Sequence, residues 1–165
     1  MSQDALRDLY VEQVQDMHSA CIQSLGMTRR LADAATDPAL KDALLDGAAG
    51  IERGRDTMDQ LARAQGADAK GAHCKGMEGL VAEAQSDVFG ERFTDDAVRD
   101  AAIIAIYQRM AHYAIAGYGT IRAFANRLGL AAERDAAQGC LDKSYDGDRR
   151  FTDIAVGEVN PAAVS

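Results

Sequence analysis

The segment Ala35-Thr36-Asp37-Pro38-Ala39-Leu40-Lys41 marks the point at which one long helix ends and a second begins. Asp37 can cap a helix N-terminus, and Pro38 suits the first helical turn, where an N–H has no intrahelical partner. On both sides of this turn, apolar and small residues recur at helical intervals. The stripes are Leu6, Tyr10, Val14, Met17, Cys21, Leu25, Thr28 and Ala32, then Leu40, Leu44, Gly47, Ile51, Gly54, Met58 and Leu61. The short link predicts that the two helices are antiparallel neighbours. Ser2 is the expected cap of the first helix, and Gly66 is expected to end the second.

A long connection follows this hairpin, because the region between Gly66 and Phe93 is rich in glycine and polar residues. It exceeds the length of an ordinary bundle loop, so it can cross the whole bundle. One short amphipathic helix is predicted inside it, from the spacing of Met77, Leu80, Val81 and Ala84.

Two further helices complete the predicted fold. The third is expected to be capped by Thr94 and to end near Leu128, and the fourth is expected to run from Leu130 to about Val156, before Asn160-Pro161. Their predicted inward residues are Ala97, Ala101, Ile104, Gln108, Ala111, Ile115 and Tyr118, then Ala137, Cys140, Leu141, Ser144, Asp148, Phe151 and Ala155. We therefore expect an all-α four-helix bundle in one domain, residues 1–165, with two antiparallel hairpins and a short fifth helix in the crossover.

The composition argues against several classes of partner. The 165 residues include 26 acidic and 18 basic residues, a net charge of −8, without a basic cluster for nucleic acid. No apolar run is long enough for a membrane span, and Met1-Ser2-Gln3-Asp4 lacks targeting features, so a cytoplasmic protein is expected. The three cysteines form no C-x-x-C pair, and reduced thiols are expected.

Motifs along the chain carry a family resemblance. The most specific are Cys74-Lys75-Gly76-Met77-Glu78-Gly79-Leu80 in the crossover and His112-Tyr113 with Tyr118-Gly119-Thr120 in the third helix. The others are residues 35–41, Gln15-Asp16-Met17, Asp100-Ala101-Ala102-Ile103, Leu141-Asp142 and Glu158-Val159-Asn160. Together they resemble the YciF-like (DUF892) branch of the ferritin-like proteins. The resemblance implies a stress-associated, dimeric bacterial protein whose biochemical role is poorly defined.

The resemblance also implies where a di-metal centre would lie. Ferritin-like metal chemistry uses a Glu from two helices and a Glu-x-x-His pair from each of the others. The matching positions here are Cys21, Gly50 with Gly54, Ala111-His112-Tyr113-Ala114, and Asp142-Lys143-Ser144. Glu52 and Asp56 lie close by on the second helix, but one displaced pair does not rebuild six ligands. We therefore expect no metal, no cofactor and no ferroxidase or peroxidase chemistry of this type.

Small residues replace the expected ligands, which leaves two interpretations of the bundle centre. The helices can approach closely and leave a packed core, or a cavity can remain for a small apolar ligand. The candidate lining residues of such a cavity are His18, Cys21, Gly50, Gly54, Ala111, Tyr113 and Ser144. No residue is assigned a catalytic role.

Each polar candidate also has a structural interpretation. Cys21 can be a small core residue rather than a reactive thiol, and His18 can be a hydrogen-bonded residue at the core boundary. His73 and Cys74 are adjacent and would need a third ligand to bind a metal in a loop. His112 and Tyr113 are expected to make helix-to-helix hydrogen bonds.

Three functional hypotheses follow. The first is a non-enzymatic scaffold or binding module, and the second is a metal- or thiol-dependent enzyme of oxidative-stress defence that uses Cys21. The third is a small-ligand carrier. A homodimer is also expected, with Leu9, Ile22 and Met27 as an apolar second stripe on the first helix.

Overall fold

A computed structural model describes residues 3–90 and 93–164, and within these ranges the regular structure is helical throughout. The elements are α1 (Gln3–Ala34), α2 (Pro38–Ala64), α3 (Lys75–Phe89), α4 (Asp96–Arg127), α5 (Ala131–Ile154), the π-helical turn η1 (Ala155–Val159) and α6 (Asn160–Ala162). The predicted all-α bundle, with a short helix in its crossover, is confirmed. Ser2, the expected cap of α1, lies outside the described residues.

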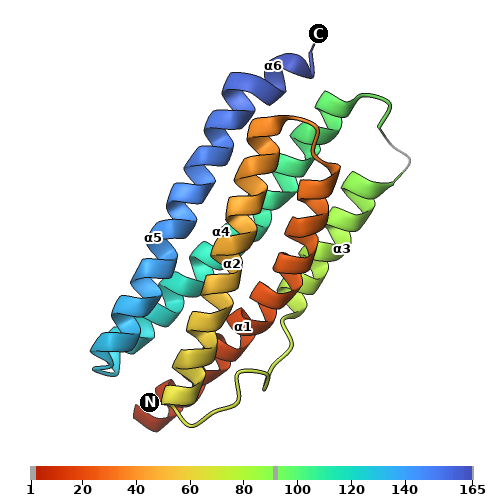
Figure 1. Cartoon of the computed structure of the whole chain (residues 1–165). Coiled ribbons are helices and arrows are strands. Elements are labelled where there is room, and N and C mark those ends of the chain that lie inside the picture. Colours follow the sequence, from red (N-terminus) through yellow and green to blue (C-terminus); the bar gives the residue numbers. More distant parts are fainter. Residues whose placement is uncertain (1–2, 91–92, 165) are drawn as a thin grey trace.

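The four long helices form a closed bundle (Figure 1). Helix α1 packs against α2 and α4, and α5 packs against the same two helices, so α2 and α4 face each other across a diagonal. The crossover helix α3 packs on the outside of α1 and α4. It therefore covers the wall that α1 and α4 form.

The first hairpin turns as its sequence predicts. The Asp37 carboxylate accepts a hydrogen bond from the Leu40 N–H at 2.8 Å, and Pro38 occupies the first turn of α2. Gly66 follows α2 with a φ of +70°, a left-handed conformation that glycine adopts without steric cost. The Asp37-Pro38 turn therefore starts α2 so that it runs antiparallel to α1.

Asp100 joins the second hairpin to this first turn. It is 2% exposed, and its carboxylate accepts hydrogen bonds from the Thr36 N–H at 3.0 Å, the Thr36 hydroxyl at 2.7 Å and the Asp37 N–H at 2.8 Å. A buried carboxylate is tolerated where donors surround it in this way. This side chain of α4 therefore connects the second hairpin to the turn between α1 and α2.

Two helix boundaries differ from the prediction. The cap of α4 is Asp95, not Thr94, because the Asp95 carboxylate accepts hydrogen bonds from two N–H groups of the first turn. The backbone also stays helical through Asn160-Pro161, where it was expected to stop. In η1 the Asn160 N–H bonds to the Ala155 carbonyl, five residues back, and Pro161 then falls in the first turn of α6. There the missing N–H of proline costs little.

The buried face of α4 is wider than the single helical stripe predicted for it. Besides Ile104 and Tyr118, α4 buries Ile103, Tyr107 and Met110, because it packs against α1, α3 and α5 at once.

The second stripe predicted on α1 is only partly exposed. Ile22 is 48% exposed, but Met27 is 3% exposed and belongs to the core. This helix packs against α3 as well as α2 and α4, which buries an additional face. A homodimer formed through this stripe stays a prediction.

Candidate functional site

A cavity of about 560 Å³ lies in the centre of the bundle. All four long helices contribute to its walls, and Met77 of α3 lines it as well. Five of the seven residues predicted to line such a cavity do so: Cys21, Gly50, Gly54, Ala111 and Ser144. The bundle centre is therefore not fully packed at these positions, and part of it is open space.

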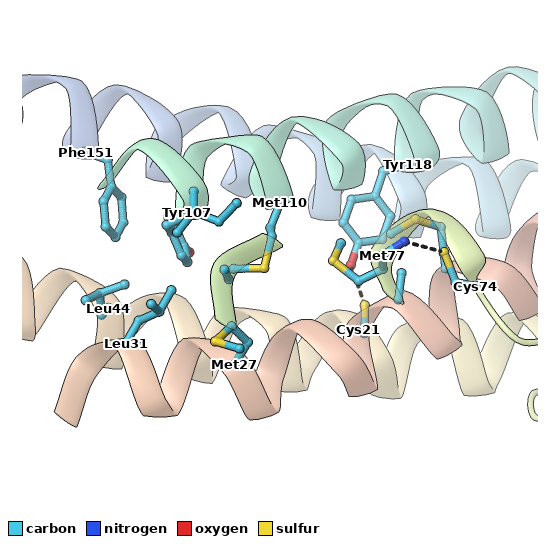
Figure 2. Close-up of a cluster of buried hydrophobic side chains, with 14 of the residues drawn as sticks. Cys21, Met27, Leu31, Leu44, Cys74, Met77, Tyr107, Met110, Tyr118 and Phe151 are labelled. Atoms are coloured by element: carbon cyan, nitrogen blue, oxygen red, sulfur yellow. Dashed lines mark hydrogen bonds between the residues drawn. The ribbon is translucent and has the colours of Figure 1, made fainter. Parts of the chain in front are cut away.

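Two tyrosines of α4 cross the bundle diagonal to reach glycines of α2. A Cβ atom at Gly47 would overlap with the hydroxyl of Tyr107, and one at Gly54 would overlap with the hydroxyl of Tyr118. Figure 2 shows both rings directed from α4 into the core. Glycine is required at these two positions because each phenol occupies the space that a side chain would fill.

The cavity extends between these two levels. Tyr107 and Tyr118 are eleven residues apart, which is three helical turns and roughly 16 Å along the helix axis. Gly50 lies between their partner glycines, and a Cβ atom there would meet only the Arg53 guanidinium, at 3.8 Å. Space for a ligand therefore opens beside Gly50.

Thr28 stands out among the polar groups of the wall. Its side chain is 0% exposed and lines the cavity, yet its hydroxyl has no hydrogen-bond partner within residues 3–90 and 93–164. Two other polar groups of the wall are bonded: the Ser144 hydroxyl donates to the Cys140 carbonyl at 2.9 Å, and the Cys21 sulfur lies 3.3 Å from the Tyr118 hydroxyl. A buried unsatisfied hydroxyl costs about 1–3 kcal/mol. Its position marks a place where a ligand atom would be stabilised.

The thiol and phenol groups of the wall are neutral at pH 7. Burial raises the pKa of the Cys21 thiol to about 11, although its bond to Tyr118 opposes this shift. Burial, with a smaller effect of the Asp148 charge, raises the pKa of Tyr107 to about 12. Burial also holds the pKa of Tyr118 well above its usual value. All charged lining residues of the described chain lie on α2 and α5, so the walls formed by α1 and α4 carry no charge and suit an apolar occupant.

The opening of the cavity lies between α2 and α5 and carries charged residues. Arg53 of α2 and Lys143 of α5 are both exposed lining residues, and neither makes an ion pair in the described part of the chain. Nearby, the Arg150 guanidinium bonds to the Asp46 carboxylate across the two helices at 2.6 Å. Three carboxylates, Asp46, Asp146 and Asp148, line the same cavity and contact Arg150, Arg149 and His112. Arg53 and Lys143 are therefore the basic lining residues without such a partner in the described ranges.

Two predicted residues lie away from the cavity. His18 is 5% exposed, and burial lowers its pKa. The Tyr113 hydroxyl donates to the Asp16 carboxylate at 2.7 Å and lies 2.9 Å from the Cys74 sulfur, so it joins α4 to α1 and the start of α3.

The other two histidines make the contacts of structural residues. The His112 ring lies 3.1 Å from the Asp148 carboxylate on α5, so the predicted helix-to-helix contact of His112 is confirmed. The His73 ring lies 3.1 Å from the Glu78 carboxylate, whereas Cys74 caps α3.

Tyr107 was missed as a site residue, and Thr28 was assigned only to the inward stripe of its helix. A signal for Tyr107 does exist, because an eleven-residue spacing places it on the same helix face as Tyr118. No pattern in the sequence shows that the Thr28 hydroxyl lacks a partner.

The residues of the centre do not fit a di-metal site. Among the described residues, no three His, Cys, Asp or Glu side chains lie close enough together to hold a metal ion. Glu52 and Asp56 take part in surface ion pairs with Arg55, and Glu52 also with Arg29. The Tyr118 hydroxyl fills the space beside Gly54, one of the two positions of α2 at which the resemblance implies metal ligands.

Comparison with known proteins places the chain in a family. Residues 5–164 match the family described as "Domain of unknown function (DUF892)". The chain is 32% identical to Protein YciF of Escherichia coli (strain K12) over 168 residues, which covers 99% of this chain and 98% of YciF.

Solved structures agree with this match. The crystal structure of the E. coli stress protein YciF superimposes with a TM-score of 0.87 at 29% identity, over 94% of this chain and 97% of that one. YcfI from Rhodopseudomonas palustris superimposes with a TM-score of 0.82 at 26% identity, over 89% and 92% of the two chains. In the described ranges, no helix combines the length and apolarity that a bilayer crossing requires. The match over nearly the whole chain shows that this protein belongs to the DUF892 family.

Proposed function

We propose that this protein is a non-enzymatic binding module, folded as one domain, that holds a small apolar ligand in the centre of its bundle. Its similarity to a stress protein supports a role in a stress response. The observation that carries the proposal is the cavity of about 560 Å³ with an unpartnered buried hydroxyl in its wall. Small-molecule sites have volumes of roughly 300–1,000 Å³ and mostly apolar walls with a few polar groups.

We propose binding of a small molecule rather than metal chemistry because the side chains that would coordinate metal ions are missing. At the positions where the resemblance implies carboxylate and histidine ligands, this chain has mostly small residues, among them Cys21, Gly50, Gly54, Ala111, Ala114 and Ser144. Two divalent ions in an apolar bundle need several surrounding carboxylates, since an uncompensated buried charge is costly. We infer that this family member has a degenerate metal site.

A thiol enzyme is less well supported. The thiolate is the reactive form of cysteine, and burial raises the pKa of all three thiols. Cys21 is 4% exposed, and its sulfur lies 3.3 Å from the Tyr118 hydroxyl. These properties are those of a core residue.

The proposal is tested with an uncharged apolar dye, N-phenyl-1-naphthylamine, whose fluorescence rises when it leaves water. The wild-type protein is expected to bind it saturably. Gly50→Leu should weaken binding at least tenfold, because the new side chain enters the cavity at a position where a Cβ atom meets only Arg53.

The matched control is Gly26→Leu. Gly26 is an exposed residue of α1, and a Cβ atom there has no heavy atom within 4 Å. This variant makes the same helical glycine-to-leucine change outside the cavity and should bind the dye like wild type. Absence of saturable binding to wild type, or equal binding by Gly50→Leu, would refute the proposal.

A further inference from the structure

The charges at the cavity opening identify the class of ligand, if the proposed function holds. We propose that the ligand is an apolar organic anion, with its apolar body in the cavity and its acidic group at the opening beside Arg53 and Lys143. This inference rests on the binding function proposed above. It adds a statement about charge that the function itself does not require.

The interior of the cavity excludes the charged part of a ligand. Ala111, Ala114 and Met110 of α4 face the space next to Gly50, and the thiol and phenol groups of the wall are neutral. Moving an ionised group into such surroundings without a counter-charge is very costly. An acidic group must therefore stay at the opening.

The opening supplies the counter-charges in a suitable place. The Arg53 guanidinium lies 3.8 Å from the point where a Gly50 Cβ atom would be, so it borders the open space directly. Lys143 lines the same cavity from α5, and its charge lowers the pKa of the neighbouring Cys140 thiol, against the dominant effect of burial. The two cations come from the two helices that flank the opening.

Neither cation is neutralised by a carboxylate in the part of the chain that the structure describes. The neighbouring Arg150 does have such a partner, Asp46. The charges beside Gly50 are therefore available to an external anion.

The buried hydroxyl of Thr28 indicates independently that the space is a binding site. It lines the cavity, is 0% exposed and has no partner among the described residues. A ligand with an oxygen or N–H group in its apolar body would satisfy this hydroxyl.

The test compares two dyes that differ in one charged group. 8-Anilinonaphthalene-1-sulfonate has the ring system of N-phenyl-1-naphthylamine with an added sulfonate. Wild type at low salt should bind the sulfonate about tenfold more tightly than the neutral dye, and raised salt should reduce this preference. The double variant Arg53→Gln/Lys143→Gln should bind both dyes about equally.

The control double variant is Arg63→Gln/Arg134→Gln, which removes the same number of charges outside the cavity lining. It should keep the preference of wild type. In competition, hexadecanoate should displace the dye more effectively than hexadecanol, which would identify a carboxylate amphiphile as one source of the anion.

The outcomes separate the two proposals. If the neutral dye binds saturably but the sulfonate binds no more tightly, the anion inference is overturned and the binding function stands. The same holds if the two double variants lose the preference equally, since the effect would then come from net charge. If neither dye binds wild type, the binding function itself fails.

Discussion

Asp100 and Thr28 are both buried polar residues, but the bundle surrounds them in opposite ways. The Asp100 carboxylate accepts three hydrogen bonds from Thr36 and Asp37 at the end of the bundle. The Thr28 hydroxyl, further towards the middle, has none among the described residues. The difference separates two roles. The Asp100 carboxylate, which holds two turns of the fold together, is satisfied internally, whereas the Thr28 hydroxyl in the cavity wall is left without a partner in the described part of the chain.

The largest effect is expected at Asp100, the residue whose hydrogen bonds are satisfied. Asp100→Ala leaves two N–H groups and one hydroxyl without their acceptor, and each such loss costs about 1–3 kcal/mol. We expect the free energy of unfolding, measured in urea, to fall by about 3 kcal/mol. Asp42→Ala, which removes an exposed aspartate of α2, should change it by less than about 0.5 kcal/mol. Similar losses in both variants would contradict the role given to Asp100.

Gly54 and Gly50 of α2 provide the next test, because the Tyr118 hydroxyl occupies the space beside Gly54 whereas Gly50 faces open space. In Gly54→Ala the new methyl group overlaps with the Tyr118 hydroxyl, and overpacking of this kind costs about 1–3 kcal/mol. In Gly50→Ala the methyl group meets no such obstacle, and replacing a helical glycine should gain about 0.5–1 kcal/mol.

In urea denaturation, the free energy of unfolding should therefore fall for Gly54→Ala and rise for Gly50→Ala. The opposite signs would distinguish a packed position from an open one only four residues away. Tyr118→Phe removes the hydroxyl that the new methyl group would meet, and it should reduce the cost of Gly54→Ala. If both glycine variants are destabilised equally, the space beside Gly50 is not open in solution.

The unsatisfied hydroxyl predicts a gain rather than a loss. Thr28→Val keeps the shape of the side chain and removes the unpartnered group, so the ligand-free protein should become more stable by about 1 kcal/mol. Thr57→Val is the matched change, because the Thr57 hydroxyl donates to the Arg53 carbonyl at 3.0 Å. Thermal or urea unfolding of ligand-free protein should show a gain for the first and a loss for the second. Equal losses would mean that the Thr28 hydroxyl is bonded.

The neutral wall of the cavity predicts a smaller effect of pH. Burial raises the pKa of Tyr118 in the folded protein, whereas in the unfolded chain it ionises near 10.0. Its contribution to stability is therefore complete below pH 10 and is lost as the pH rises further. At pH 10 the loss from this group is about 0.4 kcal/mol. The difference in free energy of unfolding between wild type and Tyr118→Phe should change by about 0.4 kcal/mol between pH 8 and pH 10. An unchanged difference would contradict a raised pKa of Tyr118 in the folded protein.

Most of the fold could be predicted because its signals are local. The Asp37-Pro38 turn, the apolar stripes and the short helix after Cys74 each follow from a few neighbouring residues. The errors arose where distant packing decides the outcome. Met27 was expected at the surface, but α1 also packs against α3. At Pro161 the π-helical turn shifts the hydrogen-bond register, which no local pattern announces.

The candidate site could be predicted only in outline. The loss of carboxylates pointed to Cys21, Gly50, Gly54, Ala111 and Ser144, and these residues do line one cavity. Periodicity does not reveal that a tyrosine reaches a glycine across the bundle diagonal, because this depends on how four helices are placed. His18 and Tyr113 were also expected in the cavity, but neither lines it, and the Tyr113 hydroxyl bonds to Asp16 of α1 instead.

The most direct test of the account examines what the native protein carries. Protein purified without chelator is analysed for metals by mass spectrometry and, under non-denaturing conditions, for bound organic molecules. We expect an organic acid that is released on denaturation and is absent from Gly50→Leu, without stoichiometric iron or manganese. Two iron or manganese ions per chain, and no organic ligand, would show that the centre of the bundle is a metal site after all.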